Sequence, residues 1–231
     1  MVTENLKKVE KKIESACTRA GRDRNDVTLI AVSKTKPVEM MREAMQCGIV
    51  TFGENKVQEI VEKQKELTEP LDWHMIGHLQ RNKVKQVVGR VKRIHSVDSI
   101  RLAKQIQLES EKRNITSDIL IEVNMAKEES KYGFMPEEVE EAIREISTYP
   151  NVKIHGLMTI APYVENPEQN RPVFRALKKL AVDIKMKNID NVSMNVLSMG
   201  MTGDYMVAIE EGATMVRVGT GIFGERNYKQ E

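Results

Sequence analysis

The chain has little of several residue types that mark particular protein classes. Its 231 residues include two cysteines, Cys17 and Cys47, one tryptophan and 4% aromatic residues. The cysteines form neither a C-x-x-C pair nor a cluster with histidine, which argues against a disulfide scaffold and against a zinc site. No stretch approaches the ~20 consecutive apolar residues that a membrane span requires. We therefore expect a cytoplasmic protein with no membrane partner.

An excess of charge of one sign is also lacking. The 36 basic residues nearly balance the 34 acidic ones, and the net charge of +2 gives no reason to expect a nucleic-acid partner. A basic stretch at residues 81–93 raises that alternative. Its residues Val84, Val87 and Val88 have helical spacing, which is typical of an amphipathic helix with a hydrated basic face. We predict no nucleic-acid binding, and steep salt-dependent retention of an oligonucleotide would contradict this.

Short apolar runs alternate with longer amphipathic stretches along the chain. Before the first run, Leu6, Val9 and Ile13 recur at helical spacing and predict an N-terminal helix. Eight strand–helix units without a linker favour a single α/β domain over 1–231, a closed (β/α)8 TIM barrel with an extra N-terminal helix. The alternative is an open doubly wound sheet. The predicted strands lie at residues 27–34, 49–53, 72–76, 92–97, 118–125, 152–160, 192–198 and 213–218.

Lys34 ends the first predicted strand. Alternate residues of a strand share a face, so Ile30, Val32 and Lys34 point the same way. If that face lines the barrel, Lys34 lies at its C-terminal end, where such barrels build their active sites. Partial burial and the neighbouring Lys36 would lower the pKa of Lys34, so that a neutral amine could attack an aldehyde. The alternative is that both lysines are ordinary hydrated loop residues.

Two glycine-containing turns follow the seventh and eighth predicted strands. The first reads LSMGMTGD and contains Ser198 and Gly200; the second reads VRVGTGIFG and contains Gly219 and Thr220. Barrels commonly bind phosphate in these two loops, through backbone N–H groups and hydroxyls. The glycines let the backbone approach an anion closely, and the hydroxyls can donate to it. The alternative is that the glycines only allow tight closure of the barrel.

Arg217 lies on the last predicted strand, on the face that would enter the barrel. A buried arginine beside a pyridine nitrogen keeps its proton, so the ring stays unprotonated and is a poor electron sink. The protein would then bind a ligand with such a ring more than it would use it in catalysis. The alternative is a structural arginine that pairs with a carboxylate such as Glu210 or Glu211.

With these residues in place, the chain resembles the pyridoxal phosphate homeostasis proteins, single-domain relatives of the fold-type III alanine racemase barrel. The resemblance covers nearly the whole length and rests on seven blocks in the same order. The blocks are AVSKTKP at 31–37, FGEN with VQE at 52–59, WHMIG with LQ and NK at 73–83, SKYG at 130–133, HGLMTI at 155–160, LSMGM at 197–201 and VRVGTGIFG at 216–224.

The resemblance implies pyridoxal 5'-phosphate (PLP) as the cofactor. The sequence departs from the usual family pattern at Lys56 and His78, which affects details of two loops and not the cofactor. The cofactor-binding residues that the resemblance implies are Lys34 for the Schiff base, Arg217 at the pyridine nitrogen, Ser198, Gly200, Gly219 and Thr220 around the phosphate, and Asn55, His74 and Met158 in the same pocket.

The resemblance also favours a carrier over an enzyme. In the alanine racemase relatives, the lysine and a tyrosine from a separate β-domain serve as the two acid–base groups. This chain stops soon after its eighth strand, and its five tyrosines include no obvious substitute at a strand end. We expect a non-catalytic monomer that holds PLP as a Schiff base, takes part in vitamin B6 homeostasis and delivers the cofactor through transient contacts with acceptor enzymes. The alternative is a small amino-acid racemase or a Schiff-base lyase that uses the same lysine.

Overall fold

Eight parallel strands form a closed barrel in this computed structural model, which describes residues 1–225. The strands follow one another around the barrel in chain order, and β8 pairs with β1 to close it. The predicted barrel is confirmed and the open sheet is wrong; residues 226–231 of the predicted domain lie outside the described residues. The strands are β1 (Thr28–Val32), β2 (Thr51–Glu54), β3 (Asp72–Met75), β4 (Arg93–Val97), β5 (Ser117–Glu122), β6 (Val152–Met158), β7 (Val192–Met201) and β8 (Met215–Val218).

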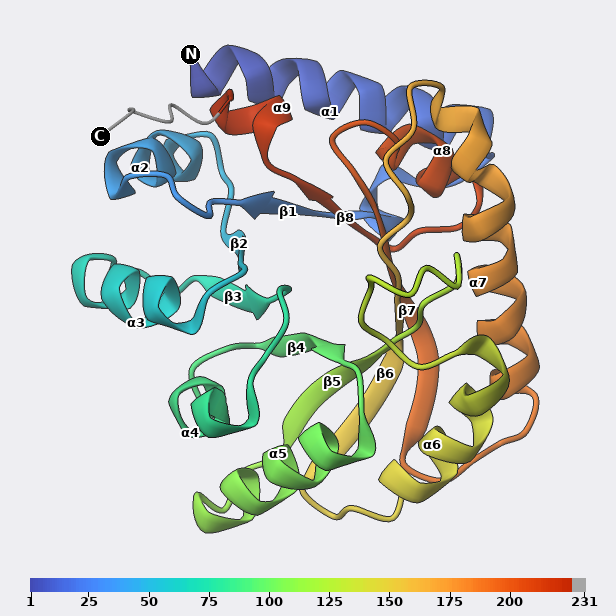
Figure 1. Ribbon diagram of the computed structural model, residues 1–231. Helices are drawn as coiled ribbons and strands as arrows, with labels where there is room; N and C mark the ends of the chain where they lie inside the picture. The colour runs from blue at the N-terminus through green and yellow to red at the C-terminus, as the bar shows by residue number, and fades with distance from the viewer. Residues whose placement is uncertain (226–231) are drawn as a thin grey trace.

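Helices surround the barrel (Figure 1). The basic stretch at residues 81–93 forms only a short helical segment before β4 begins. The α-helices are α1 (Val2–Arg19), α2 (Val38–Gln46), α3 (Val57–Glu66), α4 (Val84–Val87), α5 (Ile100–Lys112), α6 (Val139–Ile146), α7 (Arg171–Lys185), α8 (Tyr205–Glu210) and α9 (Thr220–Phe223), and the 3-10 helices are η1 (Arg24–Asp26), η2 (Arg81–Lys83), η3 (Pro136–Glu138) and η4 (Pro167–Asn170).

The N-terminal helix α1 packs beside the short helix α9, which follows β8 in the part of the chain that the structure describes. The helix after β8, α9, has only four residues, whereas α1 has 18. Helix α1 packs against α8, α9 and α2, and Figure 1 shows it alongside the short red helix α9. It buries Leu6, Val9 and Ile13, the residues whose spacing predicted it. The apolar face of α1 therefore covers the part of the barrel where the first and last strands meet.

The apolar core lies mainly between the strands and the helices. Leu29 and Ala31 of β1 and Val216 and Val218 of β8 belong to it. The side chains that alternate with them face the inside of the barrel, and many of these are polar. A barrel whose interior is lined by charged and hydrogen-bonding groups is suited to hold a polar ligand at one end.

All eight predicted strands are present, but the end of β1 differs from the prediction. The strand ends at Val32, and Lys34 belongs to the turn that follows. The Lys36 N–H donates to the carbonyl oxygen of Ser33 at 3.0 Å, which closes a four-residue turn. We call residues 33–36 the lysine turn. Lys34 therefore lies in a turn and not in a strand, although this turn stands at the end of the barrel where Lys34 was predicted.

Candidate functional site

The lysine turn and the loop after β8 lie side by side, because β1 and β8 are neighbouring strands. Ile30 pairs with Arg217, and Ala31 pairs with Val218. A Cβ placed on Gly219 would lie 3.4 Å from the side chain of Val32, so the two chains approach closely just past the strands. Lys34 is half-buried at this end of the barrel. An amine, a buried guanidinium and a glycine-containing loop therefore come from two adjacent strands.

The side chain of Lys36 is bonded to the segment that follows β8. Its ammonium group donates to the carbonyl oxygens of Phe223, Gly224 and Glu225, at 3.2, 2.9 and 2.7 Å. These carbonyls lie at the C-terminal end of α9, where cations are favoured. Lys36 thus fastens the lysine turn to the helix that follows β8. These contacts contradict the alternative that Lys36 is merely hydrated, and its expected effect on Lys34 stays a prediction.

A series of hydrogen bonds crosses the inside of the barrel. Arg217 Nη1 donates to Ser198 Oγ at 2.6 Å, and its Nη2 donates to the carbonyl oxygen of Thr159 at 2.8 Å. Ser198 Oγ lies 2.9 Å from Nδ1 of His95, and Nε2 of His95 lies 2.7 Å from Nδ1 of His74. The structure thus brings together three predicted site residues, Arg217, Ser198 and His74. It links them through His95, which the sequence pattern does not reveal.

Both histidines of this hydrogen-bonded series are neutral. Burial and the nearby Arg93 lower the pKa of His74 to about 3. Burial, His74 and Arg217 hold the pKa of His95 well below its ordinary value. A neutral imidazole has one N–H, so His95 donates through one ring nitrogen and accepts through the other. The hydrogen bonds therefore run in one direction between Ser198 and His74 and fix the orientation of both rings.

Arg217 is charged although it is buried. Burial lowers its pKa to about 10, and the negative charges of Glu122 and Asp204 oppose that effect. The alternative pairing with Glu210 or Glu211 is wrong, because these carboxylates bind Arg171. The guanidinium therefore keeps its proton at neutral pH and points into the barrel.

Glu122, at the end of β5, is, after His95, a second residue of the candidate site that the sequence pattern does not reveal. It is 5% exposed, and its Oε2 atom is buried without a hydrogen-bond partner among the described residues. Burial raises the pKa of Glu122 to about 7; the charge of Asp98 adds to the shift and Arg217 opposes it. A carboxyl group with an unused oxygen at the end of the barrel can donate a hydrogen bond to a ligand or accept one from it.

We expect Glu122→Gln to change how stability depends on pH. The folded-state pKa of Glu122 lies above its ordinary value of 4.5, so the folded protein binds this proton more tightly than the unfolded chain does. The stabilisation is complete below the unfolded pKa and is lost as the pH rises through about 7. Relative to the unsubstituted protein, the variant should therefore gain up to about 3 kcal/mol of unfolding free energy between about pH 5 and pH 8.

Urea unfolding at the two pH values measures this difference. Glu141→Gln, at an exposed site of α6, is the control and should change neither value. Equal pH dependence in the Glu122→Gln protein and the unsubstituted protein would contradict the expected raised pKa.

The end of β7 and the loop after it are shaped by a glycine and a buried carboxylate. Gly200 has φ 89°, and a Cβ on it would lie 2.6 Å from the Cβ of Ala208. Asp204 accepts from the backbone N–H of Met201 at 2.7 Å and from the side-chain amide of Asn170 at 2.8 Å. Side chains from two segments therefore hold this loop in a tight conformation that only glycine permits at position 200.

Thr202, to which the sequence pattern assigns no role, connects this loop to the start of α9. Its Oγ1 lies 3.3 Å from the backbone nitrogen of Gly219 and 3.4 Å from that of Gly221, and accepts from both N–H groups. The loops after β7 and β8, with Gly200, Gly219 and Thr220, are therefore joined. Ser198 is different, because its hydroxyl is engaged with Arg217 and His95 inside the barrel, and its contacts do not support the expected role at a phosphate.

The remaining predicted residues stand at the same end of the barrel. Met158 is the last residue of β6, is fully buried and pairs with Ser198 of β7. Asn55 follows β2, and a Cβ on Gly77 would lie 2.5 Å from its carbonyl oxygen. The loops after β2 and β3 thus touch at Gly77, which holds Asn55 close to the end of the strand that carries His74.

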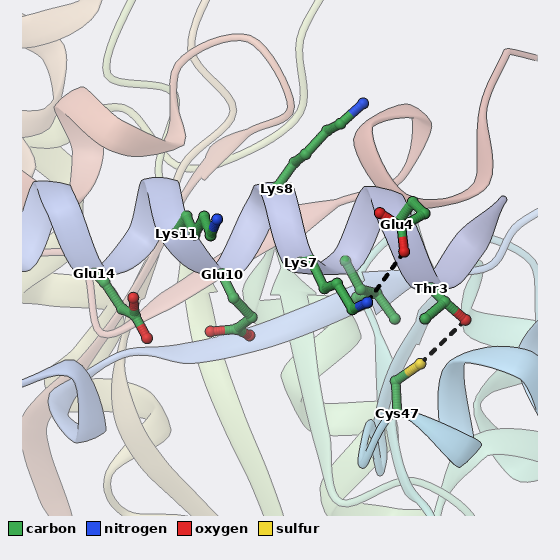
Figure 2. A pocket seen from close by; sticks show the side chains of 9 residues that line it. Thr3, Glu4, Lys7, Lys8, Glu10, Lys11, Glu14 and Cys47 are labelled. Atoms are coloured by element: carbon green, nitrogen blue, oxygen red, sulfur yellow. Dashed lines mark hydrogen bonds and ion pairs between the residues drawn. The ribbon is translucent and has the colours of Figure 1, made fainter.

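Figure 2 shows a separate groove on the outer surface, lined by side chains of α1 and by Cys47. Charges of both signs alternate along it, and Lys7 pairs with Glu4 at 3.1 Å. It contains no residue from a strand end, so we do not regard it as the functional site.

Residues 1–225 also contain no group of three or more His, Cys, Asp or Glu side chains placed to hold a metal ion. Within the same residues, no helix is both long enough and apolar enough to cross a membrane.

Comparison with known proteins gives matches over the full barrel. Residues 5–227 match the family described as alanine racemase, N-terminal domain. The chain is 50% identical over 226 residues to the pyridoxal phosphate homeostasis protein of Aquifex aeolicus, and the match covers 97% of this chain and 98% of that protein.

Solved structures agree with these matches. PipY of Synechococcus elongatus, in a structure with PLP bound, is 34% identical, with a TM-score of 0.83 and coverage of 97% of this chain and 100% of that chain. An alanine racemase of Clostridium difficile is 14% identical, with a TM-score of 0.79 and coverage of 99% of this chain and 57% of that chain, and is alike in fold alone. The chain therefore belongs to the pyridoxal phosphate homeostasis protein family, whose barrel is the alanine racemase N-terminal domain.

Proposed function

We propose that this protein binds PLP through a Schiff base with Lys34, and that it stores the cofactor and releases it to enzymes that need it. The observation that carries the proposal is the arrangement on two adjacent strands, with the Lys34 amine just past β1 and the buried Arg217 on β8. The bound PLP in the related PipY structure supports the same choice of ligand. PLP supplies an aldehyde that condenses reversibly with a neutral amine and releases one water.

The residues at this end of the barrel fit such a ligand. Arg217 offers a guanidinium that is 4% exposed and remains charged. The start of α9 offers the Thr220 hydroxyl and backbone N–H groups for a phosphate, although a phosphate would have to compete with Thr202 for the N–H groups of Gly219 and Gly221. Glu122 adds a buried oxygen without a partner among the described residues. We propose that Lys34 binds the aldehyde carbon of the ligand and that Gly200, Gly219 and Thr220 bind its phosphate. The residues that surround its ring would be Arg217, Ser198, His74, Asn55 and Met158.

The charge on Arg217 favours storage over amino-acid conversion. A guanidinium that keeps its proton leaves a facing pyridine nitrogen unprotonated, and the ring then withdraws electrons poorly. Glu122 and Asp204 oppose the effect of burial and so keep Arg217 charged, and the hydrogen bond to Ser198 orients it. The naming of relatives for homeostasis agrees with a role in storage and delivery. We therefore propose a carrier that is not an amino-acid racemase or lyase.

Spectroscopy with mass mapping tests the proposal directly. The purified protein mixed with PLP should absorb as a protonated imine, lose that band on borohydride reduction, and carry the added mass on the peptide that contains Lys34. Attachment at another lysine, or none, would overturn the assignment. Incubation of the loaded protein with a panel of L-amino acids tests the carrier role, since isomerisation or carbon–carbon cleavage clearly above that of free PLP would contradict it.

Lys36→Met should weaken the hold on the phosphate without preventing covalent attachment. The substitution removes three hydrogen bonds at the end of α9, each of a charged donor to a carbonyl oxygen. A looser α9 would raise the Kd for pyridoxine 5'-phosphate, an analogue without the aldehyde, by about tenfold. The adduct at Lys34 should still form. Fluorescence titration measures the affinity, and Lys56→Met, at an exposed lysine beside α3, is the control.

A further inference from the structure

A buried cluster of charged side chains lies directly behind Lys34. Glu54, the last residue of β2, is 0% exposed, and Lys63 of α3 is 7% exposed. Lys63 Nζ lies 2.7 Å from Glu54 Oε1 and 3.0 Å from Oε2 of Glu59, which is on the same helix. We call Glu54, Glu59 and Lys63 the acid–lysine cluster. The proposed function assigns these three residues no role.

The acid–lysine cluster bonds to the residues on both sides of Lys34. Ser33 Oγ donates to Glu54 Oε1 at 2.6 Å, and the carbonyl oxygen of Ser33 accepts from Lys63 at 2.7 Å. On the other side, the backbone N–H of Thr35 donates to Glu59 Oε2 at 2.7 Å. Each member of the cluster thus has a direct hydrogen bond to the lysine turn.

The turn needs these bonds because its backbone is strained. Lys34 and Thr35 are its two central residues, and Thr35 has φ 62°, which gives the pattern of a type II turn. A β-branched residue such as threonine rarely adopts a positive φ, because its Cβ then crowds the following carbonyl oxygen. Such strain persists only where surrounding contacts impose it, and it is found most often at functional sites.

The cluster also lies on the correct side of the strand. Ser33 follows the outward-facing Ala31 by two residues, so its side chain and Glu54 lie between the barrel and α3. If the alternation of β1 continued to Lys34, one residue further along, its side chain would lie on the opposite side, toward the inside of the barrel. The acid–lysine cluster is therefore a rigid polar support on the outer side of the strand, and it limits the positions that the Lys34 amine can take.

The charges within the cluster are balanced. Burial raises the pKa of Glu54 to about 7, against the opposing effects of Lys63 and Ser33. Burial also acts on Glu59, but the Thr35 N–H and Lys63 outweigh it, and the pKa of Glu59 is lowered. Lys63 therefore lies between two carboxyl groups, of which the more deeply buried Glu54 is the weaker acid. A balanced buried cluster of this kind fixes geometry, and removal of one charged partner disturbs it.

We propose that Glu54, Glu59 and Lys63 are positioning residues for Lys34, because they hold the lysine turn in the conformation that presents its amine to the ligand. This inference rests on the proposed function of Lys34. The cluster does not touch the ligand itself; it acts through the backbone at residues 33 and 35. Its loss should impair covalent attachment of PLP while leaving the binding of ring and phosphate intact.

Glu59→Ala is the primary variant, because Glu59 is partly exposed and its loss leaves the pair of Glu54 and Lys63 in place. Glu62→Ala, an exposed glutamate on the same helix, is the matched control. Glu59→Gln retains an oxygen that can accept from Thr35 and should restore part of the effect. The double variant Glu54→Gln/Lys63→Met removes the two most buried charges together, and the partly exposed Glu59 keeps its hydrogen bond from the Thr35 N–H.

Three measurements test the proposal on each protein. Borohydride trapping with mass mapping gives the rate of PLP attachment at Lys34. Titration with pyridoxine 5'-phosphate gives the affinity for ring and phosphate without the covalent step. Competitive acetylation of the ligand-free protein gives the reactivity of the Lys34 amine by itself. We expect attachment to slow by about tenfold to a hundredfold in Glu59→Ala and in the double variant. The Lys34 acetylation rate should change with it, and the affinity for pyridoxine 5'-phosphate should stay within about twofold.

Two results would overturn the inference alone. One is attachment at the unsubstituted rate in both variants. The other is an equal loss of attachment and of pyridoxine 5'-phosphate affinity, which would indicate a general structural role. A different result, absence of attachment at Lys34 in the unsubstituted protein, would overturn the proposed function and the inference with it.

Discussion

The Lys34→Ala protein should show no imine absorbance once free PLP has been removed, and borohydride should leave it without added mass at any specific lysine. The reason is chemical, since alanine has no amine to condense with the aldehyde. Lys36, the nearest alternative in sequence, has its ammonium group committed to the carbonyl oxygens at the end of α9. We expect loss of the imine absorbance to be complete, and an absorbance spectrum with peptide mass mapping measures it.

Two controls separate this outcome from a folding defect. The Lys34→Ala protein should still bind pyridoxine 5'-phosphate, because Arg217 and the loops after β7 and β8 are unchanged. Lys56→Ala, at an exposed lysine on the neighbouring loop, should form the adduct normally. A yellow Lys34→Ala protein with reducible PLP on one other residue would contradict the assignment of the amine.

Gly156→Ala should destabilise the barrel severely, although it adds only one methyl group. A Cβ at this position would lie 1.8 Å from the carbonyl oxygen of Val196 on β7, far inside van der Waals contact. The contact is with backbone, so no side chain can rotate away, and β6 and β7 would have to separate. The pairing of these strands is already irregular between Ile154 and Gly156. We expect a loss of about 3 kcal/mol or more of unfolding free energy, measured by urea denaturation.

Gly203→Ala is the matched control for this substitution. A Cβ on Gly203 would meet nothing within 4 Å, and the residue lies in the loop after β7. Its unfolding free energy should stay within about 0.5 kcal/mol of the unsubstituted value. If Gly156→Ala also left the free energy of unfolding unchanged, β6 and β7 could not be as close at Gly156 as the structure places them.

Most of the fold can be predicted from the spacing of apolar residues along the sequence. Each strand is marked by an apolar run and each helix by a charged stretch with apolar residues at helical spacing, and these signals depend only on which faces are buried. The end of β1 is less accessible to such reasoning. Serine and threonine are tolerated in strands, so the apolar pattern cannot locate the turn at residues 33–36, which depends on bonds from α3 and β2.

Within the site, residues on the strand ends can be identified from the sequence and their supporting residues cannot. Lys34 and Arg217 follow apolar strands directly, whereas His95 and Glu122 gain importance only because the closed barrel brings distant strands together. Lys63 does leave a signal in the sequence. It lies between Ile60 and Leu67 on the buried face of α3, where an apolar residue would be expected, and a lysine at such a position indicates a buried partner.

The place of α1 has a consequence for the order in which the protein can be completed on the ribosome. Helix α1 precedes β1 in the chain and packs against α8 and α9, which are synthesised only after β7. Until then its apolar face has no lasting cover, and β1 lacks the strand that pairs with its second edge. The nascent chain must keep this helix from premature association, so folding chaperones would be expected to engage the N-terminal segment longest.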